Sequence, residues 1–454
     1  MEKIQAKCFL TLSLWIIALG LFAQTEAVTS PPRLKAEQAL RHYVELEDEA
    51  YQWEHKESYK VGKARVHHLL LTSQKWREYV WTHQLTLFVP EEVTTDLALL
   101  FISGGSNQDG EPRWSKNSRF LSAMAELANH NKAIVTLLRQ IPNQPLFDGK
   151  VEDELISFTL HQFTQEKDFT WPLLFPMVKG AVKAMDAVQE FSGQTLGKDV
   201  EGFLVSGASK RGWTSWLTAA VGDERVKAIA PMVIDVLNMP VNLKYQLESY
   251  GEYSDQINDY VKLGIIQGMD TEEGKILATM IDPYSYREQL RVPKMIFIGT
   301  NDPYWTVDAI KNYWNEIPGK NLIHYVPNAG HDLDGGKQAL TGLSAFFALT
   351  ALDQPYPTNT WNVREEEDAA VLSITLNDPS LQGASLWSAT SADRDFRDEK
   401  WRDEKLKISD TSTITLRQAY PQDGYMAFYV DLRYRHPHGG SYTVSTRVFL
   451  MDSE

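Results

Sequence analysis

Short apolar runs without polar alternation recur along most of the chain, and stretches with helical periodicity separate them. Runs of this kind are typical of strands buried on both faces, as in a parallel sheet covered by helices. The predicted strands are residues 97–102, 132–138, 202–206, 226–234, 294–299 and 322–326. The predicted helices between them include residues 120–127 and 171–191. The pattern therefore predicts an α/β fold with a doubly wound, mostly parallel sheet.

The start of the chain and two long segments depart from this pattern. Residues 31–60 are polar and helix-prone, and the β runs at 66–71 and 80–89 are typical of an antiparallel lead-in pair. Residues 141–168 and 237–290 are longer than ordinary connections. Because ligands of open α/β sheets bind at the carboxyl ends of the strands, we predict that 237–290 forms a helical cap over that edge. A plain surface insertion is the alternative.

The hydrophobic period changes to two near the C-terminus. Residues 354–358, with two prolines, have the composition of an interdomain linker. Beyond them apolar and polar residues alternate, as at 372–376, and turn signals separate the runs. This predicts short strands in a β-sandwich-like arrangement. We therefore expect an α/β domain at 28–353 and a β-rich domain at 358–454, whose role stays open.

The first 27 residues have the features of a signal peptide. Lys3 and Lys7 precede an apolar stretch at residues 9–23, and Ala27 completes a plausible cleavage site. An uncleaved membrane anchor is the alternative, but the stretch is shorter than the ~20 residues that a spanning helix needs. We expect an exported protein, periplasmic or secreted, that is not inserted in a membrane after cleavage.

Composition excludes several classes of function. The net charge of −15, with no block rich in Lys or Arg, argues against a nucleic-acid partner. The single cysteine, Cys8, lies in the predicted signal, so the mature chain would have no thiol for a disulfide, a nucleophile or a metal. The histidines at 67–68 and at 436 and 438 have no acidic cluster near them in the sequence. We therefore expect no metal and no cofactor.

Residues 198–222 combine a strand, a tight turn and a helix. The strand 202–206 leads through small residues to Ser209, and a helix follows from Lys210. This arrangement predicts a nucleophile elbow, which holds a serine hydroxyl clear of the sheet. The motif is a variant, because Arg211 stands two residues after the serine and the glycine, Gly212, comes one residue later.

A nucleophilic serine needs a base, and the base needs an orienting acid. In this topology the acid and the histidine follow late strands. Asp302 follows the predicted strand at 294–299, and His331 follows the strand at 322–326. We therefore predict Ser209 as nucleophile, His331 as base and Asp302 as acid.

Each partner of the serine has a rival. Asp235 follows the strand at 226–234, where some proteins of this topology place the acid. His324 alternates with apolar residues inside a strand, which favours a packing role. We favour Asp302 and His331, and Asp235 stays open as the alternative acid.

An oxyanion hole needs two N–H donors. One is predicted at the backbone of Lys210, directly after the nucleophile, and the other in the glycine-rich loop after the strand at 97–102, at Gly105 or Ser106. The side chains of Lys210 and Arg211 place cations beside the serine. They could fix a carboxylate of the substrate or assist the oxyanion, which makes Arg211 a candidate substrate-binding residue. The alternatives are that they point to solvent or pair with acids on a helix.

Several strings resemble the PhoPQ-activated pathogenicity-related protein family. They are GASKRGW at 207–213, WPL at 171–173, MVK at 177–179, AMD at 184–186 and NAGH at 328–331. The resemblance implies an α/β-hydrolase fold and a link to bacterial virulence and resistance to antimicrobial peptides, and the family includes a secreted eukaryotic repressor of proliferation. The elbow is also similar to that of glucuronoyl esterases, which place Arg directly after the serine, where this chain has Lys210.

These features predict an exported serine hydrolase that cleaves an ester or amide through an acyl-enzyme. Its partner would be a small-molecule or peptide substrate, and carboxylesterase and peptidase activity both stay open. The alternative is a non-catalytic binding or signalling protein on the same scaffold. The sequence does not set the oligomeric state.

Overall fold

The computed structural model describes residues 34–453, except 117 and 409–411. The predicted signal peptide at 1–27 lies outside the described residues. Among those described, we find no helix that is both long enough and apolar enough to span a membrane. From Ala36 onward the chain forms one compact unit.

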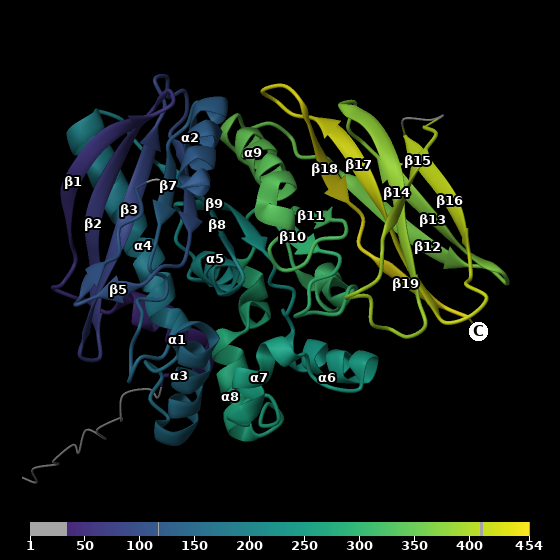
Figure 1. Cartoon of the computed structure of the whole chain (residues 1–454), viewed down its shortest axis with the longest axis horizontal. Coiled ribbons are helices and arrows are strands. Elements are labelled where there is room, and N and C mark those ends of the chain that lie inside the picture. Colours follow the sequence, from purple (N-terminus) through teal and green to yellow (C-terminus); the bar gives the residue numbers. More distant parts are fainter. Residues whose placement is uncertain (1–33, 117, 409–411, 454) are drawn as a thin grey trace, which may run out of the picture. The chain divides into compact units, whose positions relative to one another are not determined.

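A mixed sheet runs through the first three quarters of this unit (Figure 1). In spatial order its strands are β1 (Gln52–Val61), β2 (Ala64–Trp76), β3 (Tyr79–Val89), β7 (Val135–Leu138), β4 (Leu97–Ile102), β8 (Gly202–Ala208), β9 (Val226–Met232), β10 (Lys294–Gly299) and β11 (Asn321–Val326). The first three strands are antiparallel to their neighbours. The strands that follow in this order, β7, β4, β8, β9, β10 and β11, are parallel to one another. These orders and directions are those of the α/β-hydrolase fold, so the predicted fold class is confirmed.

The strand order contains a switch point between β4 and β8. From β4 the chain goes to β7 on one side, whereas β8 lies on the other side. The loops that leave β4 and β8 therefore part at their carboxyl ends and open a crevice, which is where ligands bind in sheets of this kind.

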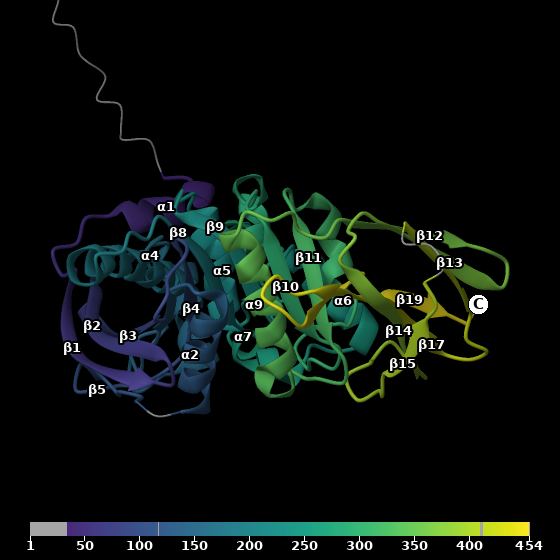
Figure 2. The ribbon, with the colours of Figure 1, turned by 90° about the horizontal axis from the view of Figure 1, so that it is seen from above.

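Helices cover both faces of the sheet (Figure 2). One face carries α2 (Arg119–Asn131) and α9 (Lys337–Ala351), which contact each other. The other carries α4 (Leu174–Phe191) and α5 (Lys210–Ala220), and α1 (Ala36–Glu45) packs on α4. With helices on both faces, β4 and β8 bury nearly every residue, which explains their continuous apolar runs.

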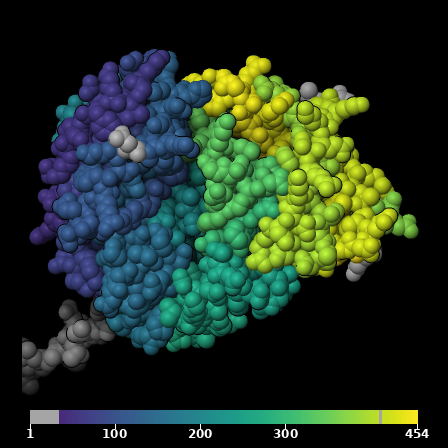
Figure 3. Space-filling model, viewed as in Figure 1, coloured from purple at the N-terminus to yellow at the C-terminus, as the bar shows by residue number. Residues whose placement is uncertain are grey.

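The two long insertions are helical and meet over the carboxyl edge of the sheet. The first contains α3 (Glu152–Glu166), and the second contains α6 (Met239–Tyr250), α7 (Asn258–Lys262) and α8 (Glu272–Ile281). Helix α3 contacts both α7 and α8, and the space-filling view shows its blue residues beside the teal cap (Figure 3). The predicted helical cap is present, and α3 is a second part of it.

One expectation about secondary structure was wrong. Residues 52–60 were expected to be helix-prone, but they belong to β1, which pairs with β2 along its whole length. A tight turn at Gly62, with φ 58°, joins the two strands. Because β1 is an exposed edge strand, its polar composition carries no strand signal, and pairing with β2 decides its conformation.

The C-terminal strands form two layers. One layer contains β12 (Asn359–Glu365), β13 (Ala369–Leu376) and β16 (Thr413–Ala419). The other contains β14 (Leu381–Ser391), β15 (Arg402–Leu406), β17 (Tyr425–Arg435), β18 (Ser441–Ser445) and β19 (Phe449–Asp452). Residues such as Leu372 and Val430 share one hydrophobic core, as in a sandwich. The second layer also continues the central sheet, because β18 pairs with β11 at Ser445 and Ile323.

This continuity predicts that residues 36–353 will not fold well alone. Ending the chain at Asp353 would expose the edge of β11 and a large apolar surface, so we expect aggregation or loss of a cooperative thermal transition. Size-exclusion chromatography and a melting curve of the truncated chain measure this. A monomer that melts at the temperature of the full chain would show that the two parts are independent.

Candidate active site

Ser209 lies in a strained turn between β8 and α5. Its backbone has φ 59° and ψ −128°, in a region that non-glycine residues rarely occupy. Its N–H donates to the carbonyl of Met232, at the end of the neighbouring strand β9, over 2.9 Å. This places the hydroxyl at the carboxyl edge of the sheet, beside the switch point. Strain of this kind concentrates at functional sites and persists only where the surroundings enforce it.

Two glycines let α5 approach the strands closely enough to enforce that turn. A Cβ on Gly207 would lie 2.7 Å from the carbonyl oxygen of Arg211. A Cβ on Gly212 would lie 2.8 Å from the carbonyl oxygen of Met232. The close contact of the helix thus falls three residues after Ser209, which explains why the glycine of the motif comes one residue late.

The structure brings Asp302 and His331 together. Asp302, 3% exposed, follows β10, and its two carboxylate oxygens lie 3.0 and 2.8 Å from His331 Nδ1. An ionised carboxylate only accepts hydrogen bonds, so Nδ1 is the donor and Nε2 carries the free lone pair of a neutral imidazole. His331 Nε2 is buried and has no hydrogen-bond partner among the described residues. It is therefore available to accept a proton.

The rival residues have other contacts. Asp235 is 1% exposed, and Tyr313 donates a hydrogen bond to its Oδ1 over 2.6 Å. Burial, with smaller effects of the Asp302 and Asp308 carboxylates, raises the pKa of Asp235 to about 7. His324 is packed inside β11, where its Nδ1 bonds to a backbone carbonyl of β18. The geometry favours Asp302 and His331 as the pair.

The predicted oxyanion loop lies next to the elbow. A Cβ on Gly104 would meet the Arg211 guanidinium at 2.6 Å, and one on Gly105 would meet the Gln140 side chain at 2.8 Å. The glycines thus make room for side chains of the protein itself. Lys210 is the first residue of α5, where N–H groups have no acceptor within the helix. Whether Gly105 or Ser106 supplies the second donor stays a prediction.

The cations beside the nucleophile are paired within the chain. Lys210 Nζ lies 2.9 Å from Glu152 and 3.0 Å from Asp153, and Arg211 lies 2.7 Å from Glu152. Arg211 also donates to the carbonyl of Ile141. Burial raises the pKa of Glu152, but the hydrogen bonds and charges of Arg211 and Lys210 outweigh it and lower that pKa to about 2. We call these four charged side chains the ion quartet.

The ion quartet changes the interpretation of Arg211. The described residues that line the cavity beside Ser209 do not include Arg211, and its role in substrate binding stays a prediction. Pairing with acids at the start of a helix, the alternative interpretation, is what the structure shows. Glu152 and Asp153 could not be identified as these partners from the sequence, because only the fold brings the start of α3 to the elbow.

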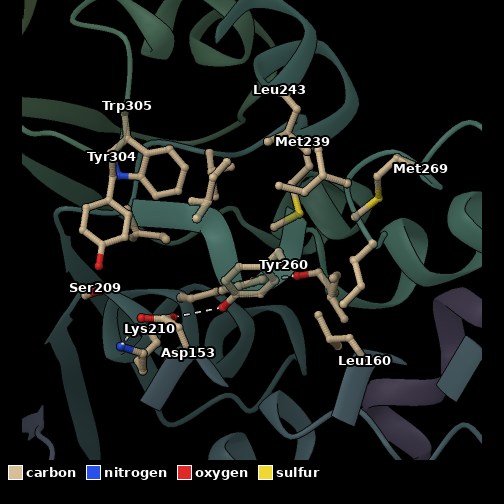
Figure 4. Close-up of a pocket in the computed structure, with 17 residues that line it drawn as sticks. Asp153, Leu160, Ser209, Lys210, Met239, Leu243, Tyr260, Met269, Tyr304 and Trp305 are labelled. Atoms are coloured by element: carbon tan, nitrogen blue, oxygen red, sulfur yellow. Dashed lines mark hydrogen bonds and ion pairs between the residues drawn. The ribbon is translucent and has the colours of Figure 1, made fainter. Parts of the chain in front are cut away.

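Tyr304 is a candidate functional residue that sequence reasoning missed. Its ring stacks on His331, with centroids 4.1 Å apart and planes 27° apart, and its N–H donates to Asp302. Figure 4 shows its hydroxyl directed toward Ser209. Its place two residues after the predicted acid was a signal that could have pointed to it.

The loop between β14 and β15 supports the loops that carry the acid and the base. Asn301, next to Asp302, donates its amide to the carbonyls of Phe396, Arg397 and Glu399. Asn328, three residues before His331, exchanges two hydrogen bonds with the backbone of Trp401. One segment, residues 396–401, therefore holds both loops in place.

No metal site accompanies this arrangement in the described part of the chain. We find no group of three or more His, Cys, Asp or Glu residues there that could hold an ion. The buried His68 bonds to Tyr59 and Thr86, and His436 bonds to Ser344.

Strand order, elbow and cap define a protein of the α/β-hydrolase class. A profile of the family described as PhoPQ-activated pathogenicity-related protein matches residues 40–397. Autocrine proliferation repressor protein A of Dictyostelium discoideum is 32% identical over 429 residues, which are 87% of this chain and 85% of that protein. The chain belongs to the PhoPQ-activated pathogenicity-related protein family.

Solved structures that the chain resembles include two esterases. Acetyl xylan esterase 1 from a Thermoanaerobacterium species is 15% identical, with a TM-score of 0.48, and the match covers 69% of this chain and 92% of that one. A glucuronoyl esterase from Solibacter usitatus is 12% identical, with a TM-score of 0.43, and the match covers 70% and 92%.

The close approach of α5 predicts the effect of adding one methyl group. Gly212→Ala should destabilise the protein by about 1–3 kcal/mol, because the new Cβ overlaps the carbonyl of Met232. Gly193→Ala is the control, since a Cβ there meets nothing within 4 Å. Denaturant unfolding measures both. Equal effects of the two substitutions would contradict the steric explanation.

Burial of Asp235 predicts a pH-dependent effect on stability. A carboxyl whose pKa is raised to about 7 favours folding most below its ordinary pKa of 3.8, and this contribution is lost as the pH rises through about 7. Asp235→Asn removes the charge and keeps an acceptor for Tyr313. The stability of the variant relative to the wild type should therefore rise between about pH 4 and about pH 7 and stay constant above that range. If the melting temperatures of the variant and the wild type differed by the same amount across this range, the assignment would be contradicted.

Proposed function

We propose that this protein is a serine hydrolase that cleaves an ester or amide through an acyl-enzyme. The observation that carries the proposal is the Asp302–His331 hydrogen bond at Nδ1, together with a buried His331 Nε2 that has no partner among the described residues. The strained Ser209 lies at the same edge of the same sheet. Three strand ends thus supply a nucleophile, a base and an acid in the chain order that hydrolases of this fold use.

The reaction begins when Ser209 Oγ attacks the substrate carbonyl and its proton moves to His331 Nε2. The new C–O bond gives a tetrahedral oxyanion, which the Lys210 N–H and a donor at Gly105 or Ser106 stabilise. His331 then gives the proton to the leaving alcohol or amine as the bond to it breaks. Water attacks the acyl-enzyme by the same route, with His331 as base, and releases the acid and the free serine.

Asp302 orients His331 and stabilises its charge. While Nε2 holds the proton, the ring is a cation in a buried site, and such a charge is costly without a partner. The carboxylate next to Nδ1 offsets that cost and fixes the tautomer that keeps Nε2 ready to accept. The hydrogen bonds of Asn301 and Asn328 hold the two loops at the spacing that this contact needs.

The proposal also includes export of the protein. Its basis is the signal-like stretch at residues 1–27, which precedes the described part of the chain. A role in virulence or in resistance to antimicrobial peptides would follow from the family that the chain belongs to. The described site requires no cofactor for the steps above.

A binding or signalling role without catalysis is the second candidate. The relative from Dictyostelium discoideum is named a proliferation repressor, which motivates this alternative. It predicts that Ser209→Ala keeps the biological effect of the protein. The proposal of catalysis predicts that the same variant loses it.

Matched substitutions of the two acids test the proposed roles. Asp302→Asn should lower kcat by about 10⁴-fold on an ester that the wild type hydrolyses, because the amide favours the wrong tautomer of His331. Asp235→Asn should change kcat by no more than about threefold, since Asp235 bonds to Tyr313 and not to His331. Ser209→Ala should lower kcat by about 10⁵-fold or more.

Steady-state kinetic assays of the purified variants measure these effects on kcat. Thermal melting checks that each variant is folded. If Asp235→Asn were the inactive variant and Asp302→Asn the active one, the acid would be Asp235. If Ser209→Ala kept the wild-type rate, the protein would not be a serine hydrolase of this kind.

A further inference from the structure

The cavity beside Ser209 indicates which kind of acyl group the site accepts. We infer that it binds a short, uncharged, apolar acyl group of the substrate. This inference rests on the proposed function. It concerns only the part of the substrate that stays attached to Ser209 after the first step.

The walls of the cavity are apolar over most of their extent. They come from the cap and from the elbow helix, and they include Trp213, Met239, Leu243, Met269 and Ile281. Figure 4 shows Ser209 and Tyr304 at one end and Leu243 and Met269 at the far end. A chain attached to the carbonyl carbon at Ser209 would therefore run toward α6 and the turn before α8. Burying each methylene there is favourable, because it removes apolar surface from water.

The charged side chains that line the cavity are already paired. Lys210 contacts Glu152 and Asp153, and Tyr260 donates its hydroxyl to Asp153 over 3.0 Å. With Arg211, the ion quartet contains two cations and two carboxylates, so its net charge is zero. A substrate carboxylate would lose its hydration there without gaining a free cation, which is strongly unfavourable. The site should therefore reject acidic acyl groups.

The position of His331 decides which part of the substrate the cavity holds. A leaving group must lie next to His331 Nε2, because that nitrogen gives it a proton. The described residues that line the cavity do not include His331, whereas Tyr304, stacked on its ring, does line it. The leaving group thus lies on the His331 side of Tyr304, and the cavity holds the acyl side.

The size of the cavity limits the chain. Its volume is about 70 Å³, roughly half that of a 150 Å³ cavity that holds benzene. A cavity of half that size holds about three carbons, so acyl groups of about three to four carbons should fit best and about six carbons should be the upper limit. The flexible side chains of Met239 and Met269 permit some adaptation but not a long fatty chain.

A series of 4-nitrophenyl esters tests the inference on the full chain. The acetyl, butyryl, hexanoyl and palmitoyl esters vary length, and the hemisuccinyl ester matches butyryl in carbon number but carries a carboxylate. We expect kcat/KM to be highest for butyryl and at least about tenfold lower for palmitoyl and hemisuccinyl. A preference for palmitoyl or hemisuccinyl that depends on Ser209 would overturn the inference and leave the proposed function intact.

Leu243→Trp fills the far end of the cavity, and Leu247→Trp is its matched control. Both lie on α6, but Leu243 is 8% exposed and lines the cavity, whereas Leu247 is 40% exposed and does not. Leu243→Trp should lower kcat/KM for hexanoyl by about tenfold or more and change acetyl little, while Leu247→Trp changes neither. Equal effects of the two variants would overturn the inference.

Binding to Ser209→Ala provides a test that does not depend on catalysis. Ligand-observed NMR should detect methyl butyrate but not monomethyl succinate on this variant, and the additional change Leu243→Trp should weaken the signal of methyl hexanoate. If this binding pattern were found but the wild type hydrolysed none of the esters, the proposed function would be rejected and the cavity assignment would be kept. Preferential binding of monomethyl succinate would overturn the assignment itself.

Discussion

The close packing of α5 on the ends of β8 and β9 is the constraint on which the site depends. Ser209 can hold its left-handed backbone only because the helix begins at once behind it and its N–H bonds to Met232. Gly207 and Gly212 allow that approach, since any larger side chain would overlap backbone carbonyls. Local strain at the serine is thus balanced by tertiary packing of the elbow as a whole.

Two further sets of interactions fix the surroundings of the elbow. The ion quartet joins the elbow to the start of α3 and so anchors one part of the cap beside the serine. On the other side, residues 396–401 bond to Asn301 and Asn328 in the loops of the acid and the base. The loop between β14 and β15 therefore contributes to the geometry of the site, although none of the proposed catalytic residues lies on it.

The sequence predicted the features whose signals are local. Buried strands such as β4 and β10 appear as continuous apolar runs, and the positions of Asp302 and His331 at strand ends indicated that the two would lie together. It could not predict β1, whose polar residues form a strand only because β2 is beside them. Likewise, the partners of Arg211 lie about sixty residues earlier in the chain, and only the fold brings them together.

Mapping the site of a covalent phosphonate adduct tests the central claim most directly. The probe mimics the acyl step, and digestion followed by mass spectrometry identifies the modified residue. Our account predicts one adduct, on the peptide that contains Ser209, formed much more slowly in Asp302→Asn. An adduct on another residue, or equal labelling of Ser209→Ala, would contradict it.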